Sequence, residues 1–344
     1  MSSEATRPIV AITMGDPAGI GPEVIVKALA QPEIYAECRP LVVGDAGCLA
    51  RESQRLGLPL TVRPVRTVAE ALFQPGIVDV YQATDLDLSQ ILPGRVDARA
   101  GAAAVQAVQV ATRLALAGAV QAICTAPLNK EAMHLAGYPY PGHTEMLGAL
   151  TGAREYTMLL VADRLRVVHV STHVSLRQAI ERVKKDRVLR TIRLAHQAAT
   201  EYLGIAEPHI GVAGLNPHAG ESRLFGDEDA DEIAPAVAAA QAEGLRVSGP
   251  WPGDTLFPRA ARGEFDIVVA MYHDQGHIPV KMLGFDRGVN VTIGLPIIRT
   301  SVDHGTAFDI AGQGRASPTS LIEAIRMAAQ IARRRLSGAV PGAR

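Results

Sequence analysis

Short runs of β-branched and aliphatic residues alternate with longer helical patterns from one end of the chain to the other. This alternation is typical of repeated β-α units, in which helices cover both faces of a mostly parallel sheet. The predicted strands are residues 9–12, 40–43, 120–124, 166–170, 210–213, 267–270 and 289–293. The pattern therefore predicts an α/β protein.

Helical patterns lie between and after these strands. One covers residues 105–116, and another covers residues 179–202 and ends before Gly204, a residue type suited to the position after a helix. A further helix is predicted over residues 318–336, with Ser317 as its N-cap and a proline in its first turn. The arginines at its C-terminal end are interpreted as solvated charge that complements the helix dipole.

Composition narrows the class of protein. With 344 residues, of which 48% are hydrophobic, the chain is long enough for about two domains. The 34 basic and 35 acidic side chains leave a net charge of −1, so no basic field favours nucleic acid as a partner. Aromatic residues make up only 4%, which argues against a stacking surface for bases.

Cysteine usage and the N-terminus indicate the cellular compartment. Cys38, Cys48 and Cys124 match neither a disulfide framework nor a zinc ribbon, so free thiols in a reducing cytosol are expected. The N-terminus has no signal-peptide pattern, and the longest weakly polar stretch, residues 101–124, is too polar for a membrane span. We therefore expect a cytoplasmic protein with no membrane or nucleic-acid partner.

Polar clusters follow several of the predicted strands directly. Residues 13–23 and 125–130 are two of them, and the others contain His173, His218, and His273 with His277. Ligands of open α/β sheets bind outside the carboxyl ends of the strands. These clusters are therefore expected to line a site.

Three histidines, His173, His218 and His273, each follow a different strand. Imidazole suits zinc, iron, cobalt or manganese, and three protein ligands would leave coordination positions for substrate. A single histidine is more often structural, and for His273 and His277 the alternative is that one turns inward as a cap while the other is solvated. The remaining candidates, His134, His169, His196 and His209, are interpreted as structural.

The loop 15–23 is rich in glycine but lacks the G-x-G-x-x-G pattern of dinucleotide-binding folds. A helix that starts near Pro22 could bind an anion at its N-terminus, or the loop could be only a tight turn; both remain open. Further on, Lys281, Arg287, Asn290 and Arg299 follow His273 closely. Cations near a metal site suit an anionic substrate, to which residues 142–144, Gly-His-Thr, would add small donors.

Long motifs in a fixed order resemble the 4-hydroxythreonine-4-phosphate dehydrogenase family along nearly the whole chain. They are ITMGDPAGIGPE, TAPLNKEAMHLAGYPYPGHTE, GLNPHAGE, YHDQGH and GVNVTIGLPIIRTSVDHGTAFDIAG. The resemblance implies that His173, His218 and His273 bind the metal. It also implies substrate contacts by His143, Thr144, Lys281, Asn290 and Arg299, and places Asp254 near the substrate.

A second resemblance lies within the first. The segment from His304 to Gly312 is similar to the adenosine-binding loop of isocitrate and isopropylmalate dehydrogenases, which implies that His304, Gly305, Thr306 and Ala307 bind NAD or NADP. The implied fold is the two-lobed α/β arrangement of those enzymes, with an interdomain cleft. One lobe is expected to hold residues 1–128 and 300–344, and the other residues 129–299. The implied working form is a homodimer whose active sites lie at the interface and take metal ligands from both chains.

The activity implied by the family is NAD(P)-dependent oxidation and decarboxylation of 4-hydroxythreonine-4-phosphate to 3-amino-2-oxopropyl phosphate. A divalent metal, zinc first and magnesium, manganese or cobalt as alternatives, would lower the pKa of the substrate hydroxyl and stabilise the enolate that decarboxylation forms. Lys281 would neutralise the alkoxide or anchor the substrate, and Asp254 would assist proton transfer.

One departure from the family pattern leaves the substrate open. Many members involved in vitamin B6 synthesis read YHDQG followed by Leu-Pro, whereas this chain has His277 and Ile278 before Pro279. That form resembles a branch acting on D-threonate or D-erythronate 4-phosphate, and is also similar to an enzyme that oxidises the cis-dihydrodiol of terephthalate. Outside this family, a metal-dependent hydrolase, a phosphate acyltransferase and a non-catalytic binding module are the alternatives.

Overall fold

The computed structural model describes residues 7–284 and 287–338, which fold as two compact units. Unit 1 comprises Met1–Arg154 and Leu295–Arg333, and unit 2 comprises Glu155–Gly294 and Arg334–Arg344. The sequence-based boundaries, at 128 and 300, divide the chain differently. Residues 130–151 belong to unit 1 because the two helices they form pack against the long helix α4 of that unit.

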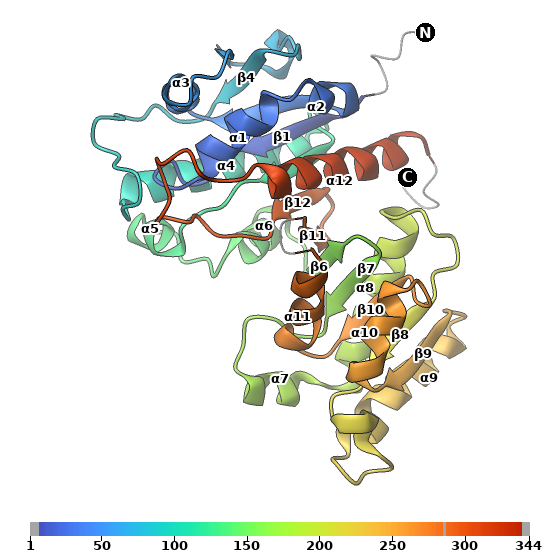
Figure 1. The fold of residues 1–344 in the computed structure, drawn as a ribbon. Coiled ribbons are helices and arrows are strands. Elements are labelled where there is room, and N and C mark those ends of the chain that lie inside the picture. Colours follow the sequence, from blue (N-terminus) through green and yellow to red (C-terminus); the bar gives the residue numbers. More distant parts are fainter. Residues whose placement is uncertain (1–6, 285–286, 339–344) are drawn as a thin grey trace. The chain divides into compact units, whose positions relative to one another are not determined.

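Unit 1 is built on a parallel sheet with the strand order β3-β4-β2-β1-β5-β12. Figure 1 labels β4, β1 and β12 of this sheet. The strands are β1 (Ile9–Thr13), β2 (Arg39–Gly44), β3 (Thr61–Val65), β4 (Ile77–Gln82), β5 (Ala122–Thr125) and β12 (Arg299–Val302). The helices are α1 (Gly21–Leu29), α2 (Pro32–Glu37), α3 (Ala46–Arg55), η2 (Val68–Glu70), α4 (Ala98–Leu116), α5 (Lys130–Leu135), α6 (His143–Thr151) and α12 (Thr319–Leu336). Helix α4 packs along β1, β2 and β5, and every residue of β1 and β5 is buried.

Unit 2 has the strand order β11-β6-β7-β10-β8-β9, in which β6 runs antiparallel to both of its neighbours. The strands are β6 (Thr157–Ala162), β7 (Leu165–His169), β8 (Ile210–Ala213), β9 (Val247–Trp251), β10 (Ile267–Ala270) and β11 (Val289–Ile293). The helices are α7 (Leu176–Arg182), α8 (Lys185–Glu201), η3 (Pro217–Gly220), η4 (Asp229–Ile233), α9 (Ala234–Ala242), α10 (Gly253–Ala261) and α11 (His273–Gly284). Its core gathers apolar side chains from β6, β7, β10 and α10.

The predicted α/β class is confirmed, and each predicted strand is present to within two residues at its ends. The prediction missed β3, β4, β6, β9 and β12. Strand β12 has the sequence RTSV, and its polar side chains gave no sign of a strand although all four residues are buried. Strand β6 is joined to β7 by a tight hairpin at Asp163, where φ is +50°, and the sequence carries no Asn-Gly or Asp-Gly signal there.

The single helix predicted over residues 179–202 is wrong. Two helices replace it, because α7 begins with a capping box formed by Ser175 and Gln178, and the chain leaves helical geometry at Val183 and Lys184. The start of α8 is then capped from a distant segment, since a Glu232 carboxylate oxygen accepts the backbone N–H of Lys185 at 2.7 Å. The break therefore depends on a tertiary contact and has no local Gly or Pro signal. The helix predicted over residues 318–336 is confirmed as α12, one residue shorter at its start.

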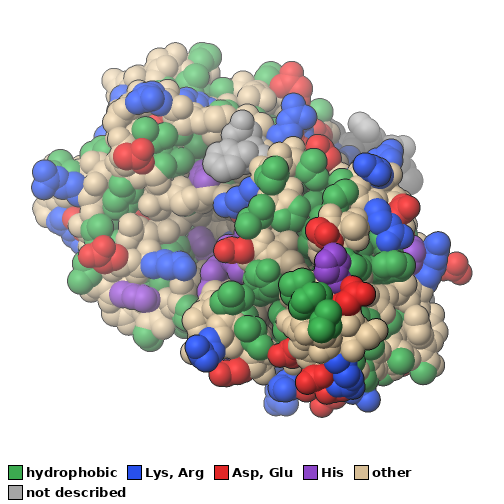
Figure 2. Space-filling model, turned by 60° about the horizontal axis from the view of Figure 1, so that its bottom comes forward, with side chains coloured by type: hydrophobic (Ala, Val, Ile, Leu, Met, Phe, Trp, Pro, Cys, Tyr) green, Lys and Arg blue, Asp and Glu red, His purple; other side chains and the backbone are tan. Residues whose placement is uncertain are grey.

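Several properties expected from composition also appear in the described residues. All three cysteines are free and buried, and burial raises the pKa of each thiol to about 12, so they are unreactive at neutral pH. Acidic and basic side chains are interspersed over the face drawn in Figure 2, as the near-zero net charge predicts. No helix within residues 7–284 or 287–338 is long and apolar enough to cross a bilayer.

Candidate active site

A buried cation lies in unit 1, where β5 ends and β12 begins. Arg299 is 2% exposed, and its Nε and Nη2 atoms lie 3.2 and 2.7 Å from the Thr125 hydroxyl oxygen. Burial lowers the pKa of Arg299 to about 10, which still leaves the guanidinium charged at neutral pH. A charge held out of water is costly unless an anion or hydrogen bonds compensate it. This position suits a negatively charged ligand.

His143 and Thr144 occupy the first turn of α6 in the same unit. Burial, followed by the positive charges of Arg299 and Lys130, lowers the pKa of His143 well below its ordinary value, so its ring is neutral. The Nε2 atom of His143 is buried and has no hydrogen-bond partner in the structure. A phosphate or carboxylate could accept hydrogen bonds from several donors here. They are the His143 imidazole, the backbone N–H groups in the first turn of α6 and the Arg299 guanidinium.

The loop after β1 packs against the predicted cofactor segment. The backbone N–H of Ile20 donates to the Thr306 carbonyl at 3.0 Å, and a Cβ on Gly19 would lie 2.9 Å from Thr306. In the same segment, Ala307 adopts a left-handed φ of +44° and His304 has a buried Nε2 without a partner. Helix α1 starts at Gly21 with a proline in its first turn, which confirms the helix start predicted there. Loop 13–23 and residues 304–307 therefore pack closely against each other within unit 1.

Asp16, in this loop, is a carboxyl group with no exposed surface. One oxygen accepts the backbone N–H of Ala18 at 2.8 Å, and the other is buried without a partner. Desolvation raises the pKa of Asp16 to about 6. Ionisable groups shifted by burial are concentrated at functional sites, so Asp16 joins the candidates that the sequence did not single out.

Replacing Asp16 by asparagine should stabilise the protein at pH 7.5 by about 2–3 kcal/mol. The folded carboxyl ionises near pH 6 and the unfolded one near 3.8. The contribution of this carboxyl to wild-type stability is therefore greatest below about pH 4, falls as the pH rises to about 6, and stays low above that. Urea unfolding of both proteins at pH 4 and pH 7.5 checks this. Equal gains at the two pH values would contradict the shifted ionisation.

Two of the predicted metal ligands meet in unit 2. His173 and His273 line a cavity of about 600 Å³, with 5.8 Å between their ring centroids. The Nδ1 atom of His273 lies 2.7 Å from an Asp274 carboxylate oxygen, which makes Nδ1 the donor and leaves Nε2 for a metal. A carboxylate that orients an imidazole in this way is the usual outer partner of a metal-binding histidine.

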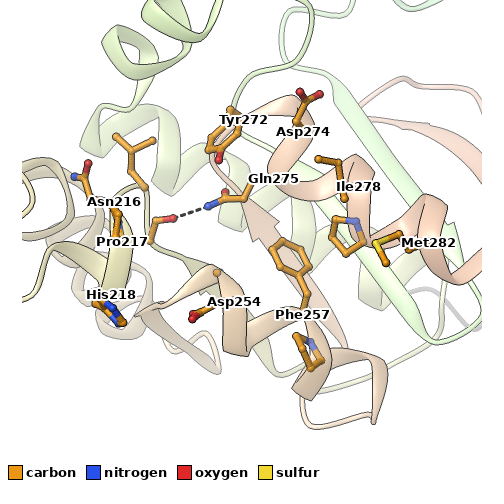
Figure 3. A pocket seen from close by; sticks show the side chains of 15 residues that line it. Asn216, Pro217, His218, Asp254, Phe257, Tyr272, Asp274, Gln275, Ile278 and Met282 are labelled. Atoms are coloured by element: carbon orange, nitrogen blue, oxygen red, sulfur yellow. Dashed lines mark hydrogen bonds between the residues drawn. The ribbon is translucent and has the colours of Figure 1, made fainter.

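The third predicted ligand, His218, lines a neighbouring cavity of about 630 Å³ together with Asp254 (Figure 3). Tyr272 and Asp274 line both cavities, so the two are separated by the turn between β10 and α11. Gln275 fixes this turn, since its amide donates to the Gly214 carbonyl at 2.6 Å (Figure 3). His173 and His273 are thus brought together, and His218 is adjacent to them but in a separate cavity.

Backbone strain marks the segment that holds His218. His218 and Ala219 both have φ of +52°, and the left-handed conformation recurs over residues 221–223. Such residues cost of order 1–3 kcal/mol each and are concentrated at functional sites. The buried carboxylate of Asp229 compensates this strain, because it accepts the backbone N–H groups of Leu215 and Asn216 at 2.8 and 3.1 Å.

The donor set fits a divalent transition metal in part. Two imidazoles, one oriented by a carboxylate, are suitable ligands for zinc, cobalt or manganese. Among the described residues, no three His, Cys, Asp or Glu side chains of this chain converge on one point. A metal site built on this pair would therefore need a further ligand.

Two further predicted residues, Lys281 and Asn290, also belong to unit 2. Lys281 is exposed on α11, two turns after His273, and its positive charge contributes to lowering the pKa of His277. Asn290 lies on β11 opposite Leu160, with a buried side-chain oxygen that has no partner in the structure. Both positions are compatible with ligand contact.

The sequence interpretation underrated two histidines. His277 is the one that turns inward, at 6% exposed, and its ring stacks on His273; His169 lies behind it at 1% exposed. Burial lowers the pKa of His277 to about 4 and that of His169 well below its ordinary value, so both rings are neutral at physiological pH. The spacing of four residues between His273 and His277 was the signal that could have found the pair.

The fold and the clusters of buried ionisable side chains at its strand ends are typical of an α/β enzyme. Residues 36–328 match the family model described as pyridoxal phosphate biosynthetic protein PdxA. The chain belongs to this family, which confirms the resemblance seen in its motifs.

Relatives and a solved structure agree with this membership. D-threonate 4-phosphate dehydrogenase from Cupriavidus necator is 54% identical over 333 residues, which span 95% of this chain and 98% of the relative. 4-Hydroxythreonine-4-phosphate dehydrogenase from Desulforapulum autotrophicum is 48% identical over 94% of this chain and 95% of the relative. The crystal structure of 4-hydroxythreonine-4-phosphate dehydrogenase from Klebsiella pneumoniae superposes with a TM-score of 0.89, at 49% identity over 95% of this chain and 98% of that one. The protein is an oxidoreductase of the dehydrogenase type.

Proposed function

We propose that the protein oxidises and decarboxylates a small 4-phosphorylated hydroxy acid, using NAD or NADP and a divalent metal. The observation that carries the substrate class is the buried Arg299 guanidinium beside the neutral His143 ring, whose Nε2 is buried without a partner. A phosphate would accept hydrogen bonds from the guanidinium and from the imidazole N–H.

D-threonate 4-phosphate is the first candidate substrate, supported by the relative of that name at 54% identity. 4-Hydroxythreonine-4-phosphate is the second, supported by the name of a 48% identical relative. These identities reverse the order that the overall family resemblance implied, and agree with the departure at His277 and Ile278. The two acids share the phosphate and the C3 hydroxyl and differ at C2, where one has a hydroxyl and the other an amine. D-erythronate 4-phosphate, a stereoisomer of the first, is a third candidate, and terephthalate dihydrodiol, which has no phosphate, is disfavoured.

Each group of residues has a distinct part in this proposal. In unit 1, Arg299, His143 and Thr144 hold the phosphate, and residues 304–307 hold the cofactor. A bound nicotinamide would accept hydride from C3, and a bound divalent cation, zinc first, would stabilise negative charge on the C3 oxygen and on the enolate left after carbon dioxide departs.

In unit 2, His173 and His273 are positioned as metal ligands, and Asp274 fixes the tautomer of His273. Lys281 is suited to bind the substrate carboxylate or to neutralise the alkoxide. Asp254, which lines the cavity with His218, is suited to take the hydroxyl proton or to return one to C2 of the enolate.

We also propose that two chains form a homodimer through unit 2, which would let a partner supply the missing metal ligand. Unit 2 exposes several large apolar side chains, which mark a protein-binding surface where they form a patch. They include Leu176, Ile180, Leu224, Phe225, Ile278, Met282 and Leu283.

Met282, which is 82% exposed, is the best position to test the dimer. Met282→Glu should convert the dimer to a monomer and lower turnover, because a charge would be buried in the interface. Leu135→Glu, at an exposed apolar residue of unit 1, is the matched control and should leave the dimer intact. Light scattering after size-exclusion chromatography measures both masses. A wild-type monomer with full activity would contradict the proposal.

A substrate panel tests the proposed function. Formation of reduced nicotinamide is followed with D-threonate 4-phosphate, D-erythronate 4-phosphate, 4-hydroxythreonine-4-phosphate and unphosphorylated D-threonate, with NAD and with NADP. We expect the highest kcat/KM for D-threonate 4-phosphate and a loss of at least about 100-fold without the phosphate. Equal activity on the unphosphorylated acid would contradict the assigned role of Arg299 and His143.

A further inference from the structure

The imidazole of His273 is supported on one face by a second imidazole. His277, one turn later on α11, stacks on it with 3.6 Å between ring centroids and 12° between ring planes. The Nδ1 atom of His277 lies 3.1 Å from the backbone oxygen of His273 and 3.2 Å from Nε2 of His169. Because a carbonyl oxygen only accepts, His277 donates from Nδ1, and these contacts fix the rotation of its ring.

His169 forms the base of this stack at the end of β7. Its ring centroid lies 4.7 Å from that of His277. Gly276 allows the close approach of α11, since a Cβ at this position would lie 2.3 Å from Nε2 of His169. A glycine inside a helix destabilises it by about 1 kcal/mol relative to alanine. The glycine at this position therefore lowers the stability of the helix but permits its contact with His169.

Neither supporting ring faces the two cavities described above. His277 is 6% and His169 1% exposed, and neither lines the cavity of His173 or that of His218. Neither ring is therefore placed to line a ligand site in these cavities. The stacking of His277 on His273 is the direct contact by which it would act on a ligand there.

We propose that His277, backed by His169, is a positioning residue that holds the His273 ring in the orientation needed for metal binding. This inference rests on the metal site of the proposed function. Asp274 fixes one ring nitrogen of His273, and His277 fixes the plane of the ring. A ligand whose ring is fixed beforehand loses less conformational freedom when the ion binds, and outer partners of metal-binding histidines typically change affinity by about 10–100-fold.

Cobalt affinity of the full-length, chelator-stripped protein tests the proposal. Titration is followed by the visible absorption of bound Co²⁺ and by competition with a chromophoric chelator. His277→Leu should weaken binding by at least about tenfold, and His277→Phe, which keeps a flat ring against His273, should stay within about threefold of wild type. His196→Leu, the same change at another half-buried histidine of unit 2, should leave the affinity unchanged.

Equal cobalt affinity for wild type and His277→Leu would overturn the proposal, as would a Phe variant as weak as the Leu variant. If His277→Leu does not fold, the Phe variant is compared with His277→Asn, which keeps a hydrogen-bonding group but no ring. The Asn variant should then bind more weakly, and equal affinities would overturn the stacking role. A wild-type protein that binds no cobalt would contradict the metal site of the proposed function itself, so the two failures are distinguishable.

Discussion

Replacing His218 by alanine is expected to abolish chelator-sensitive turnover while leaving the fold intact. His218 is one of three histidines that the family resemblance assigns to the metal, and it is held in a strained, left-handed conformation. The loss in kcat should exceed the roughly 10–100-fold that outer partners of metal ligands cause. Initial rates with added divalent metal measure the effect. Alanine tolerates a φ of +52° no better than histidine does, so thermal stability should be unchanged or slightly lower.

His196→Ala is the matched control for this variant, since it removes an imidazole from the same unit without touching either cavity. It should retain wild-type rates. A His218→Ala enzyme that keeps full, chelator-sensitive activity would show that this side chain is not a metal ligand. The adjacent pair of His173 and His273 would then have to bind the metal without it.

Replacing Arg299 by methionine should lower kcat/KM for a phosphorylated substrate on the order of 10²–10³-fold. The guanidinium is buried, so its contact with an anion would be screened little by water or salt. The free energy of unfolding should not fall, because methionine fills much of the same volume without the cost of burying a charge. Steady-state kinetics and urea unfolding of the same preparation separate the two effects.

Arg299→Lys should lose less activity than Arg299→Met, since it keeps a charge but loses the planar fork that grips a phosphate. The loss should appear mainly as a higher KM if the contact is made equally in the ground and transition states. An Arg299→Met enzyme with an unchanged KM for the phosphorylated acid and a lower stability would indicate a purely structural arginine.

The strand and helix pattern could be predicted from the sequence wherever local chemistry decides it. Buried strands such as β8 and β10 are continuous apolar runs, and their predicted bounds match the structure. The elements that the sequence did not predict depend on contacts between distant parts of the chain. Strand β12 is polar in sequence but buried, and the break between α7 and α8 depends on Glu232, which lies 47 residues beyond Lys185.

The candidate site, like the fold, could be predicted from the sequence only in part. The position of polar residues after strands pointed to His173 and His273, which the structure places side by side. The spacing of His273 and His277 was a local signal, but no local pattern indicates that His169, 108 residues before His277, would pack against His277. Asp16 was hidden for a related reason, because its raised pKa comes from burial that only the packed loop creates.

The most direct test measures reduced nicotinamide and released carbon dioxide together, with D-threonate 4-phosphate as the substrate. We predict equal amounts of the two products, no turnover after removal of metal by a chelator, and recovery when zinc, cobalt or manganese is added back. Turnover that is insensitive to the chelator, or substrate consumption with no reduced nicotinamide formed, would contradict a metal-assisted oxidative decarboxylation.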